Sequence, residues 1–343
     1  MSEQKIRVKV ISRVPEREWL RYFPGPVPEW GECRFYFSPE TRGYDWLVVY
    51  NDLPPSGAER YSMSEEILAC SRKNTLLVTY EPATITTYGT AFTSQFGHVL
   101  TSQRDWELPH PRRIYSQPAI GWFYGTGGDR LRTWREMYDA NPAKSRQIST
   151  VNATKKNKTS VHESRTQFIA MVKGAIPELD VYGRGVRPMA DKAEAIDPYY
   201  HHLAIENHFA SHHWTEKLAD CFLGLTLPFY AGCPNAADYF PEDSFIPIDI
   251  YREEDAVAIM RKVMHDNEYN RRRPALREAR RRLLEEYNFF AVISVIIKER
   301  HQPGVAANIR LRSRRAVLRH APLAALKHVI EKFHVRARHW LGD

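Results

Sequence analysis

A pair of charged residues at a predicted helix start is the first candidate for anion-binding chemistry. Apolar residues recur at helical spacing over 214–224, so Glu216 and Lys217 fall in the first turn of the predicted helix. A cation is unfavourable at the positive end of a helix dipole unless an anion binds there. Glu216 is placed to accept hydrogen bonds from sugar hydroxyls. The alternative, a surface Glu–Lys pair, remains open at this point.

A second candidate anion site follows a predicted strand at 147–151. The loop Asn152-Ala-Thr-Lys-Lys-Asn-Lys-Thr-Ser160 is strongly basic, and Ser160-Val-His-Glu163 fits a capping box that opens a helix. Arg165 would then lie near the first turns, where its guanidinium can clamp a phosphate. A solvated loop with an arginine paired to a carboxylate is an equally good interpretation.

A candidate general base follows an apolar strand. The run Thr75–Tyr80 delivers Glu81 to the carboxyl end of the strand, and Pro82 stops it. Partial burial would raise the pKa of such a carboxylate and suit it to accept a proton. A strand-end acid in solvent is the stronger interpretation on this observation alone.

The histidines and cysteines give no metal-binding pattern. Five histidines crowd one stretch, but their spacing matches no known ligand set. Four distant cysteines without a Cys-x-x-Cys pair argue against a zinc ribbon and a disulfide framework. Asp-x-Asp is absent, so we expect no metal and no cofactor. The histidines and cysteines are His201, His202, His208, His212, His213, Cys33, Cys70, Cys221 and Cys233.

Short apolar runs alternate with helical patterns, which is typical of α/β proteins with largely parallel sheets. Strands are predicted at 6–11, 46–50, 75–80, 98–101, 147–151, 179–183, 202–206, 227–230 and 245–248. Helices are predicted near 60–73, 129–139, 161–175, 214–224, 253–266 and 275–299. The polar segment 139–146 contains a proline and is the best linker. We expect two Rossmann-like domains facing a cleft, at 1–145 and 146–300, with a tail at 301–343.

Composition places the chain among globular proteins. Its 343 residues include 41 aromatic residues, which excludes disorder as the main state. No run of about 18 apolar residues occurs, and the charged N-terminus does not read as a signal peptide, so we expect a cytoplasmic protein. Of the net charge of +8, the segment 301–343 carries +7, from nine Lys or Arg and two acids.

The basic segment has three interpretations. Leucines and other apolar residues recur at helical spacing over 318–336 among lysines and arginines, which favours an amphipathic helix on an anionic membrane surface. A helix packed on the body, or a partly disordered tail, is the alternative. A nucleic-acid-binding role would also suit the charge, but no recognition motif supports it, and we expect no nucleic-acid partner.

About fifty residues resemble the α1,3-fucosyltransferases, glycosyltransferase family 10, of bacterial type. The family pattern is Glu-Asn-Ser, a short loop, Tyr-x-Thr-Glu-Lys, a helix and a Pro-(Val/Ile)-Tyr-x-Gly-x-Pro turn. Tyr182-Gly183, Asp191-Lys192 and Glu81-Pro82 fit the pattern more loosely. The matching residues are Glu206-Asn207, Thr215-Glu216-Lys217, Pro228-Phe-Tyr-Ala-Gly232-Cys-Pro234-Asn235, Tyr239-Phe240-Pro241 and Ser244-Phe245-Ile246.

The resemblance implies a GT-B fold and an inverting transfer of L-fucose from GDP-fucose, without a metal, to a GlcNAc- or Glc-type hydroxyl. It implies a bacterial enzyme that acts on glycans of the cell surface, such as lipopolysaccharide or a lipid-linked glycan. By position, Lys217 and Arg165 would hold the pyrophosphate, Glu216 the ribose, and Glu81 would be the base. The remaining donor-site residues implied are Asn207, Glu206, His213 and Tyr182.

Two departures from the family pattern keep a second donor open. His208 stands where the family has serine, and His213 stands where it has tyrosine. Both would lie near the donor, so a GT-B transferase that uses another nucleotide sugar is the alternative within the class. A basic nucleic-acid-binding protein is the alternative from another class.

Overall fold

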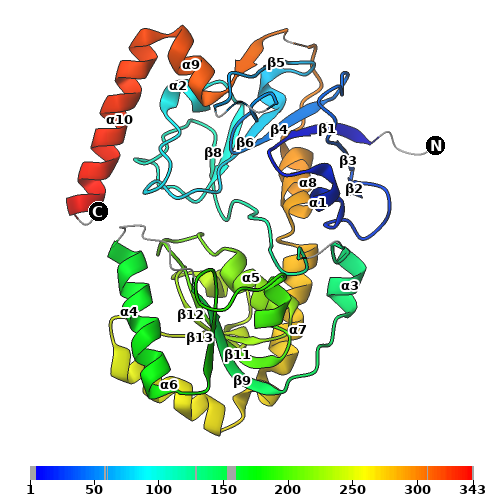
Figure 1. Cartoon of the computed structure of the whole chain (residues 1–343). Helices are drawn as coiled ribbons and strands as arrows, with labels where there is room; N and C mark the ends of the chain where they lie inside the picture. Colours follow the sequence, from blue (N-terminus) through cyan, green and yellow to red (C-terminus); the bar gives the residue numbers. More distant parts are fainter. Residues whose placement is uncertain are drawn as a thin grey trace. The chain divides into compact units, whose positions relative to one another are not determined.

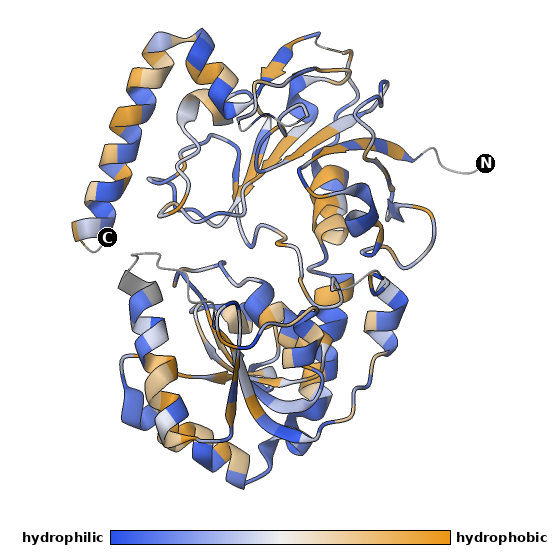
Figure 2. Ribbon diagram, viewed as in Figure 1, coloured by the Kyte–Doolittle hydropathy of each residue, from blue (hydrophilic) through white to orange (hydrophobic). Residues whose placement is uncertain are grey.

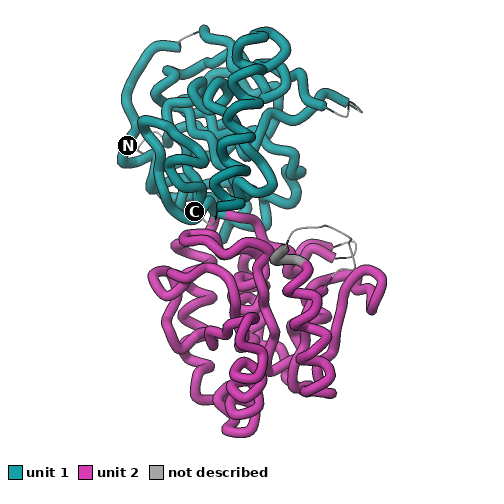
Figure 3. The backbone as a smooth tube through the Cα atoms, turned by 90° about the vertical axis from the view of Figure 1, so that its left-hand side faces the viewer, with its two compact units in different colours: residues 1–119, 289–343 teal, residues 120–288 magenta. Residues whose placement is uncertain are grey.

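The chain forms two compact units, Met1–Ala119 with Phe289–Asp343, and Ile120–Asn288 (Figure 3). The computed structural model describes residues 5–57, 59, 61–127, 130–152, 160–306 and 308–341, without the side chains of 160–162. The sequence predicts boundaries at 145/146 and 300/301 instead. The chain therefore enters the second unit about 25 residues earlier than predicted, and residues after 288 return to the first.

The first unit is built on a seven-stranded sheet of order β2-β3-β1-β4-β6-β7-β8. All neighbours are parallel except β2 and β3. The central strands β4, β6 and β7 are wholly buried, which explains their continuous apolar sequences. The strands are β1 (Ile6–Ile11), β2 (Glu29–Trp30), β3 (Cys33–Tyr36), β4 (Trp46–Tyr50), β6 (Thr75–Val78), β7 (His98–Thr101) and β8 (Arg113–Tyr115).

Helix α8 (Phe289–Arg300) belongs to the first unit because of an aromatic cluster. The ring of Phe290 lies 4.1 Å from that of Phe23 and 4.7 Å from that of Phe35. Phe289 lies 4.7 Å from Trp19 of α1 (Glu16–Leu20). These buried rings fix α8 against the sheet, although its sequence continues the helical pattern of the preceding unit.

The C-terminal segment completes the first unit. Strand β14 (Arg310–Arg312) pairs antiparallel with β5 (Glu65–Ile67), and α9 (Arg314–His320) packs on α2 (Thr90–Thr93). The helix predicted over 60–73 is therefore wrong: β5 and the short 3-10 helix η1 (Arg72–Asn74) occupy that stretch. The helix predicted over 318–336 is divided, with α10 (Pro322–Leu341) beginning at a proline, which suits a first helical turn.

The second unit has a five-stranded, all-parallel sheet of order β10-β9-β11-β12-β13. Its strands are β9 (Arg146–Val151), β10 (Leu179–Tyr182), β11 (Tyr199–Ile205), β12 (Leu227–Ala231) and β13 (Ile246–Pro247). The order reverses between β9 and β11, and ligands bind beyond the carboxyl ends of strands at such a switch point.

Helices cover both faces of this second sheet. In Figure 1, α4 and α6 lie on one side and α5 and α7 on the other. The apolar colours of Figure 2 run through the strands that the helices cover. The predicted α/β class, with largely parallel sheets in two Rossmann-like units, is confirmed. The helices are α3 (Trp134–Asp139), α4 (Ser160–Ala175), α5 (Glu216–Leu223), α6 (Glu253–His265) and α7 (Glu268–Glu285), with the 3-10 helices η2 (Lys192–Ala195), η3 (Ala236–Asp238) and η4 (Glu242–Ser244).

Hydrogen bonds explain why residues 120–145 belong to the second unit. The backbone N–H groups of Phe123 and Tyr124 both donate to Oδ1 of Asp220, each at 3.1 Å. The Nζ of Lys144 donates to the Gly224 carbonyl at 2.7 Å and to Oγ1 of Thr226 at 2.8 Å. Among the helices that the structure describes, none is long and apolar enough to cross a membrane.

Candidate functional site

A cavity of about 330 Å³ lies in the second unit at the carboxyl ends of β9 and β11. It occupies the switch point of the sheet, where a ligand is expected. Three cations line it, one each from α4, η2 and α5. The lining residues are Phe123, Thr126, Val151, Arg165, Met189, Ala190, Lys192, His202, Leu203, Ala204, Ile205, Glu216 and Lys217.

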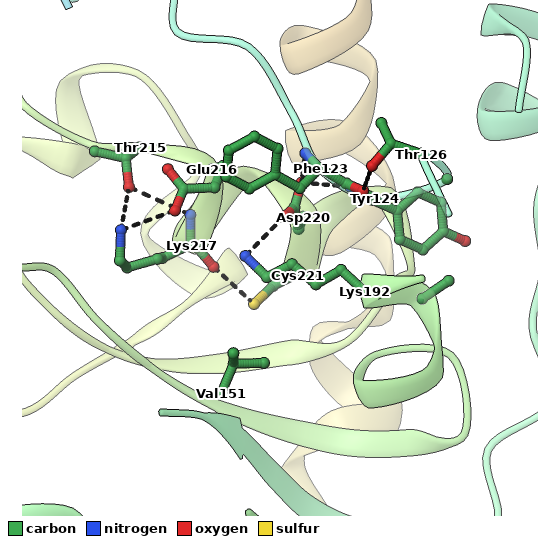
Figure 4. A network of polar contacts seen from close by, with 12 residues as sticks. Phe123, Tyr124, Thr126, Val151, Lys192, Thr215, Glu216, Lys217, Asp220 and Cys221 are labelled. Carbon is green, nitrogen blue, oxygen red and sulfur yellow. Dashed lines mark hydrogen bonds and ion pairs between the residues drawn. The ribbon is translucent and has the colours of Figure 1, made fainter. Parts of the chain in front are cut away.

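The start of α5 brings two predicted residues to this cavity. Thr215 is the N-cap, and its Oγ1 accepts a hydrogen bond from the backbone N–H of Lys217 at 3.4 Å. The Nζ of Lys217 lies 2.8 Å from Oε1 of Glu216, as Figure 4 shows. Trp214, Leu218 and Phe222, which belong to the apolar pattern over 214–224, are buried, so the helix presents Lys217 and Glu216 to the cavity on a fixed core.

Glu206 holds the N-terminus of α5 in place by accepting hydrogen bonds from Thr215. Its Oε1 accepts from the backbone N–H of Thr215 at 2.8 Å, and its Oε2 accepts from the Thr215 hydroxyl at 2.6 Å. Oε2 also lies 3.5 Å from Nζ of Lys217. A Cβ at Gly232 would lie 2.3 Å from Cγ of Glu206, so glycine is required there. Glu206 is 1% exposed and does not line the cavity, which makes it a support for Lys217.

The charges of this group are set by burial and by one another. Burial raises the pKa of Glu206. Burial opposes ionisation of Glu216 too, but Lys217 and Lys192 outweigh it and hold the pKa of Glu216 at about 2. Burial lowers the pKa of Lys217, but Glu216 and Glu206 outweigh it and raise the value above the usual one. Lys217 is therefore a firmly charged cation beside a firmly charged carboxylate.

Arg165 is a buried cation without a carboxylate partner among the described residues. It is 8% exposed, and it donates to Oδ1 of Asn207 at 2.7 Å and to the Val151 carbonyl at 2.5 Å. Its Nε is buried and makes no hydrogen bond to a described residue. Burial lowers its pKa, which measures the cost of holding this charge without a counter-ion. A bound oxyanion would supply one.

The basic loop before α4 cannot be compared with its prediction. Residues 153–159 and the side chains of residues 160–162 lie outside the described part of the chain. The predicted capping box around Ser160 falls there. Arg165 itself is described, and it links the carboxyl ends of β9 and β11 through Val151 and Asn207.

Lys192 is the third cation that lines the cavity. In the sequence it belongs only to Asp191-Lys192, one of the looser matches to the family pattern. Its Nζ lies 2.8 Å from Oδ2 of Asp220, which is fully buried. The same carboxylate holds the backbone of Phe123 and Tyr124, and Figure 4 shows this network around the cavity. The signal in the sequence is the capping box at Asp191, which begins η2 and places Lys192 in its first turn.

The remaining predicted residues do not line the cavity. Tyr182 is buried, and its hydroxyl lies 3.0 Å from that of Tyr199. Both tyrosines belong to an apolar cluster against which Val151 and Met189 pack, and these two residues line the cavity. His213 is 4% exposed, and its ring lies 5.5 Å from that of His208. Glu81 lies in the first unit just after β6, where its carbonyl accepts a hydrogen bond from Nε2 of Gln103 at 2.9 Å.

Two of the clustered histidines belong to the core. His202 Nδ1 lies 2.8 Å from Oγ of Ser149, and the ring of His201 stacks on Phe229 at 5.4 Å. Burial lowers the pKa of His201 to about 4 and that of His202 to about 3, so both are neutral at pH 7. Across the described residues, no group of three or more His, Cys, Asp or Glu side chains could hold a metal ion.

Comparison with known proteins gives one family. The model of the C-terminal part of glycosyltransferase family 10 (fucosyltransferase) matches residues 141–273. The matched segment contains all five strands of the sheet that bears the cavity. Among curated proteins, no sequence matches the chain.

Solved structures of α1,3-fucosyltransferases are similar to the chain at low sequence identity. One with GDP is 14% identical over 90% of this chain and 94% of that chain, with a TM-score of 0.49. One with GDP-fucose is 14% identical over 94% of this chain and 92% of that chain, with a TM-score of 0.45.

Proposed function

We propose that the protein is a glycosyltransferase that transfers L-fucose from GDP-fucose to a glycan hydroxyl. The match of residues 141–273 to the model of glycosyltransferase family 10 supports this proposal. The observation that carries the donor assignment is Arg165, a buried guanidinium without a carboxylate partner among the described residues, at the switch point of a parallel sheet. Nucleoside diphosphates bind at such points, with their phosphates against helix starts and cations.

Each donor contact follows from the geometry of the cavity. Arg165 and Lys217 would hold the pyrophosphate, because both line the cavity, Arg165 as a buried cation and Lys217 with its side chain 18% exposed. Glu216 remains ionised and would accept hydrogen bonds from the ribose hydroxyls. Four further residues would hold the cations and the cavity wall in position without contacting the donor: Asn207, Glu206, Tyr182 and His213.

The proposed reaction is a single displacement with inversion. Glu81 would take the proton from an acceptor hydroxyl of a GlcNAc- or Glc-type unit, and the oxygen would attack the anomeric carbon of fucose. The bond from that carbon to the diphosphate breaks as the new bond forms. GDP leaves with the electron pair, and its charge is stabilised by Arg165, Lys217 and the helix start, a role that needs no metal.

Calorimetric titration with GDP, UDP and ADP tests the donor proposal. We expect GDP to bind at least tenfold more tightly than UDP or ADP. Tighter binding of UDP would contradict the fucose assignment and favour the alternative donor that His208 and His213 suggest. Failure of all three nucleotides to bind would contradict the donor site itself.

The acceptor is proposed to be a lipid-linked or other cell-surface glycan, reached from the cytoplasmic face of a bacterial membrane. Helix α10 supports this, because its apolar side chains are exposed among Lys327, Lys332 and Arg336, which are exposed too. A basic amphipathic surface of this kind suits anionic lipid. The exposed apolar residues are Leu323, Leu326, Val329, Ile330, Phe333, Trp340 and Leu341.

Flotation with vesicles tests the membrane proposal. We expect the protein to float with anionic phospholipid vesicles and not with neutral ones. The double variant Leu326→Ser/Phe333→Ser should lose most of this binding, whereas Ile259→Ser on α6, also exposed, should retain it. Equal flotation of the two variants would contradict a role for α10.

A further inference from the structure

A second cavity of about 750 Å³ lies in the second unit between α3 and α7. It shares no lining residue with the candidate donor site. Most of its wall is polar, and four arginines of α7 contribute to it. The lining residues are Tyr138, Asp139, Ala140, Asn141, Asn270, Arg273, Pro274, Arg277, Glu278, Arg280 and Arg281.

The arginines of the arginine-rich helix α7 fall into two groups. In the first group, each arginine is paired with a carboxylate of the helix. Arg272 lies 2.8 Å from Glu268, and Arg281 lies 2.8 Å from Glu278. Arg271 and Arg282 also contact these two carboxylates, at 3.0 Å and 2.9 Å. The third acid of the helix, Glu285, lies 3.0 Å from Arg281. Every acid of α7 is therefore paired with one of these arginines, and none is paired with the arginines that remain.

The remaining arginines are Arg273, Arg277 and Arg280, and all three line the cavity. Their spacing of four and three residues places them on one face of the helix. No carboxylate of the described residues lies within ion-pair distance of any of them, although Asp139 and Glu278 line the same cavity. The three guanidinium groups therefore concentrate positive charge in one concave, polar site.

Two of these guanidinium groups are partly withdrawn from water, and one of them has a buried N–H group without a hydrogen bond to a described residue. Arg280 is 9% exposed and donates to the Ala140 carbonyl at 2.5 Å. Arg273 donates to Oδ1 of Asn141 at 2.5 Å, while its Nε is buried and makes no hydrogen bond to a described residue. Burial lowers the pKa of Arg280, as expected for a charge held away from water without a counter-ion. A bound anion would remove this cost.

We propose that the cavity between α3 and α7 binds a compact phosphate-type anion, such as a diphosphate, through Arg273, Arg277 and Arg280. Planar guanidinium groups match phosphate oxygens with paired hydrogen bonds. Asp139 and Glu278 on the same wall would repel an extended polyanion such as a nucleic acid but leave room for a compact ligand. The proposal goes beyond the donor site, which lies elsewhere in the same unit.

Titration with inorganic diphosphate tests the proposal on the full chain. Saturating GDP is kept present to occupy the donor site, and binding is followed by calorimetry. We expect one further diphosphate site, and the variant Arg273→Gln/Arg277→Gln should weaken it at least tenfold, since two guanidinium groups that donate charge-assisted hydrogen bonds are lost. The variant Arg271→Gln is the matched control on α7, because Arg271 is paired with Glu268.

The comparison of the two variants is the decisive measurement. Equal diphosphate affinity in the two chains, or no diphosphate site beyond the one that GDP occupies, would overturn the proposal. The difference between the variants identifies this cavity whether or not GDP binds, so failure of the donor assignment leaves the test intact. Both variants should keep the GDP affinity of the unchanged protein, because none of the three substituted arginines lines the donor cavity.

Two further arms identify the source of the anion. If vesicles that carry a lipid diphosphate bind the protein and soluble diphosphate displaces them, the ligand is a lipid headgroup. If soluble diphosphate binds and such vesicles do not compete, the ligand is a free anion. Both outcomes support the site. A single-stranded oligonucleotide that binds at this cavity more tightly than diphosphate would overturn the assignment to a compact anion.

Discussion

At the scale of single residues, Lys217 serves two purposes that mutagenesis can separate. It lines the donor cavity, and it is the counter-ion of the buried Glu206. Lys217→Ala should weaken GDP binding at least tenfold and also destabilise the protein by about 3–5 kcal/mol, because a buried carboxylate loses its partner. Calorimetry with GDP and urea unfolding measure the two effects.

A second substitution at Glu206 distinguishes the two effects of losing Lys217. Adding Glu206→Gln to Lys217→Ala should restore part of the stability, since one of the two carboxylates that lose Lys217 no longer carries a charge, but should leave GDP binding weak. Lys262→Ala is the control, because its ion pair with Asp266 is exposed on α6. If GDP affinity recovers together with stability, Lys217 is a structural residue and its proposed phosphate contact is wrong.

Glu81 should separate binding from turnover. Replacing it by glutamine keeps the size of the side chain and removes the basic oxygen. Glu81→Gln should therefore bind GDP unchanged and lose turnover with GDP-fucose by roughly 100-fold or more, the scale of general-base removal. Glu59→Gln, also in the first unit, is a matched control. Full activity of Glu81→Gln would show that another group accepts the proton.

At the scale of elements, strand β11 makes the fold sensitive to acid. His202 is 2% exposed, and burial lowers its pKa to about 3, below the usual value of 6.5. Between these values the unfolded chain binds a proton that the folded chain does not, so the free energy of unfolding falls as pH decreases from 6.5 towards 3. The loss for His202 is about 2 kcal/mol between pH 6.5 and pH 5.

Urea unfolding at several pH values measures this dependence. His202→Asn should reduce the slope of stability against pH in that window by up to about 1.4 kcal/mol per pH unit, the value for one proton. His265→Asn is the control, because the side chain of His265 is 89% exposed at the end of α6. A slope equal to that of the unchanged protein would mean that His202 is protonated in the fold.

Elements with local signals could be predicted from the sequence, and elements that depend on distant partners could not. The apolar runs of β1 and β4 match the structure to the residue. Strand β5 was predicted as a helix because its partner β14 lies more than 240 residues away. The pattern over 275–299 hides the break between α7 and α8, which no proline or glycine marks.

The residues of the candidate site divide in the same way, into those with a local signal in the sequence and those that depend on a distant partner. Arg165, Asn207 and Lys217 lie far apart in the sequence, yet their meeting could be expected, because each follows a strand of one parallel sheet. Lys192 could not be singled out in this way. Its place in the cavity depends on Asp220, a buried acid inside the apolar core of α5, and no local pattern links the two residues.

At the scale of the whole molecule, the chain leaves the first unit and returns to it, so its C-terminal segment should act as part of a domain. Leu311 and Ala316 are buried, the Ser313 hydroxyl donates to the Ser62 carbonyl at 2.8 Å, and Arg314 lies 3.1 Å from Asp52. A chain that ends at residue 300 loses all of these contacts. It should lose roughly 5 kcal/mol or more of the stability of the first unit.

A chain that ends at residue 321 is the matched comparison, because it keeps β14 and α9 and loses only α10, most of whose residues are exposed. Its urea midpoint should stay near that of the full chain, whereas the 1–300 chain should show early unfolding and rapid proteolysis of the first unit. Both should still bind GDP, since every residue of the donor cavity lies within 120–288. If the two truncated chains unfold alike, residues 301–321 form the separate tail that the charge pattern suggests, and the first unit is complete without them.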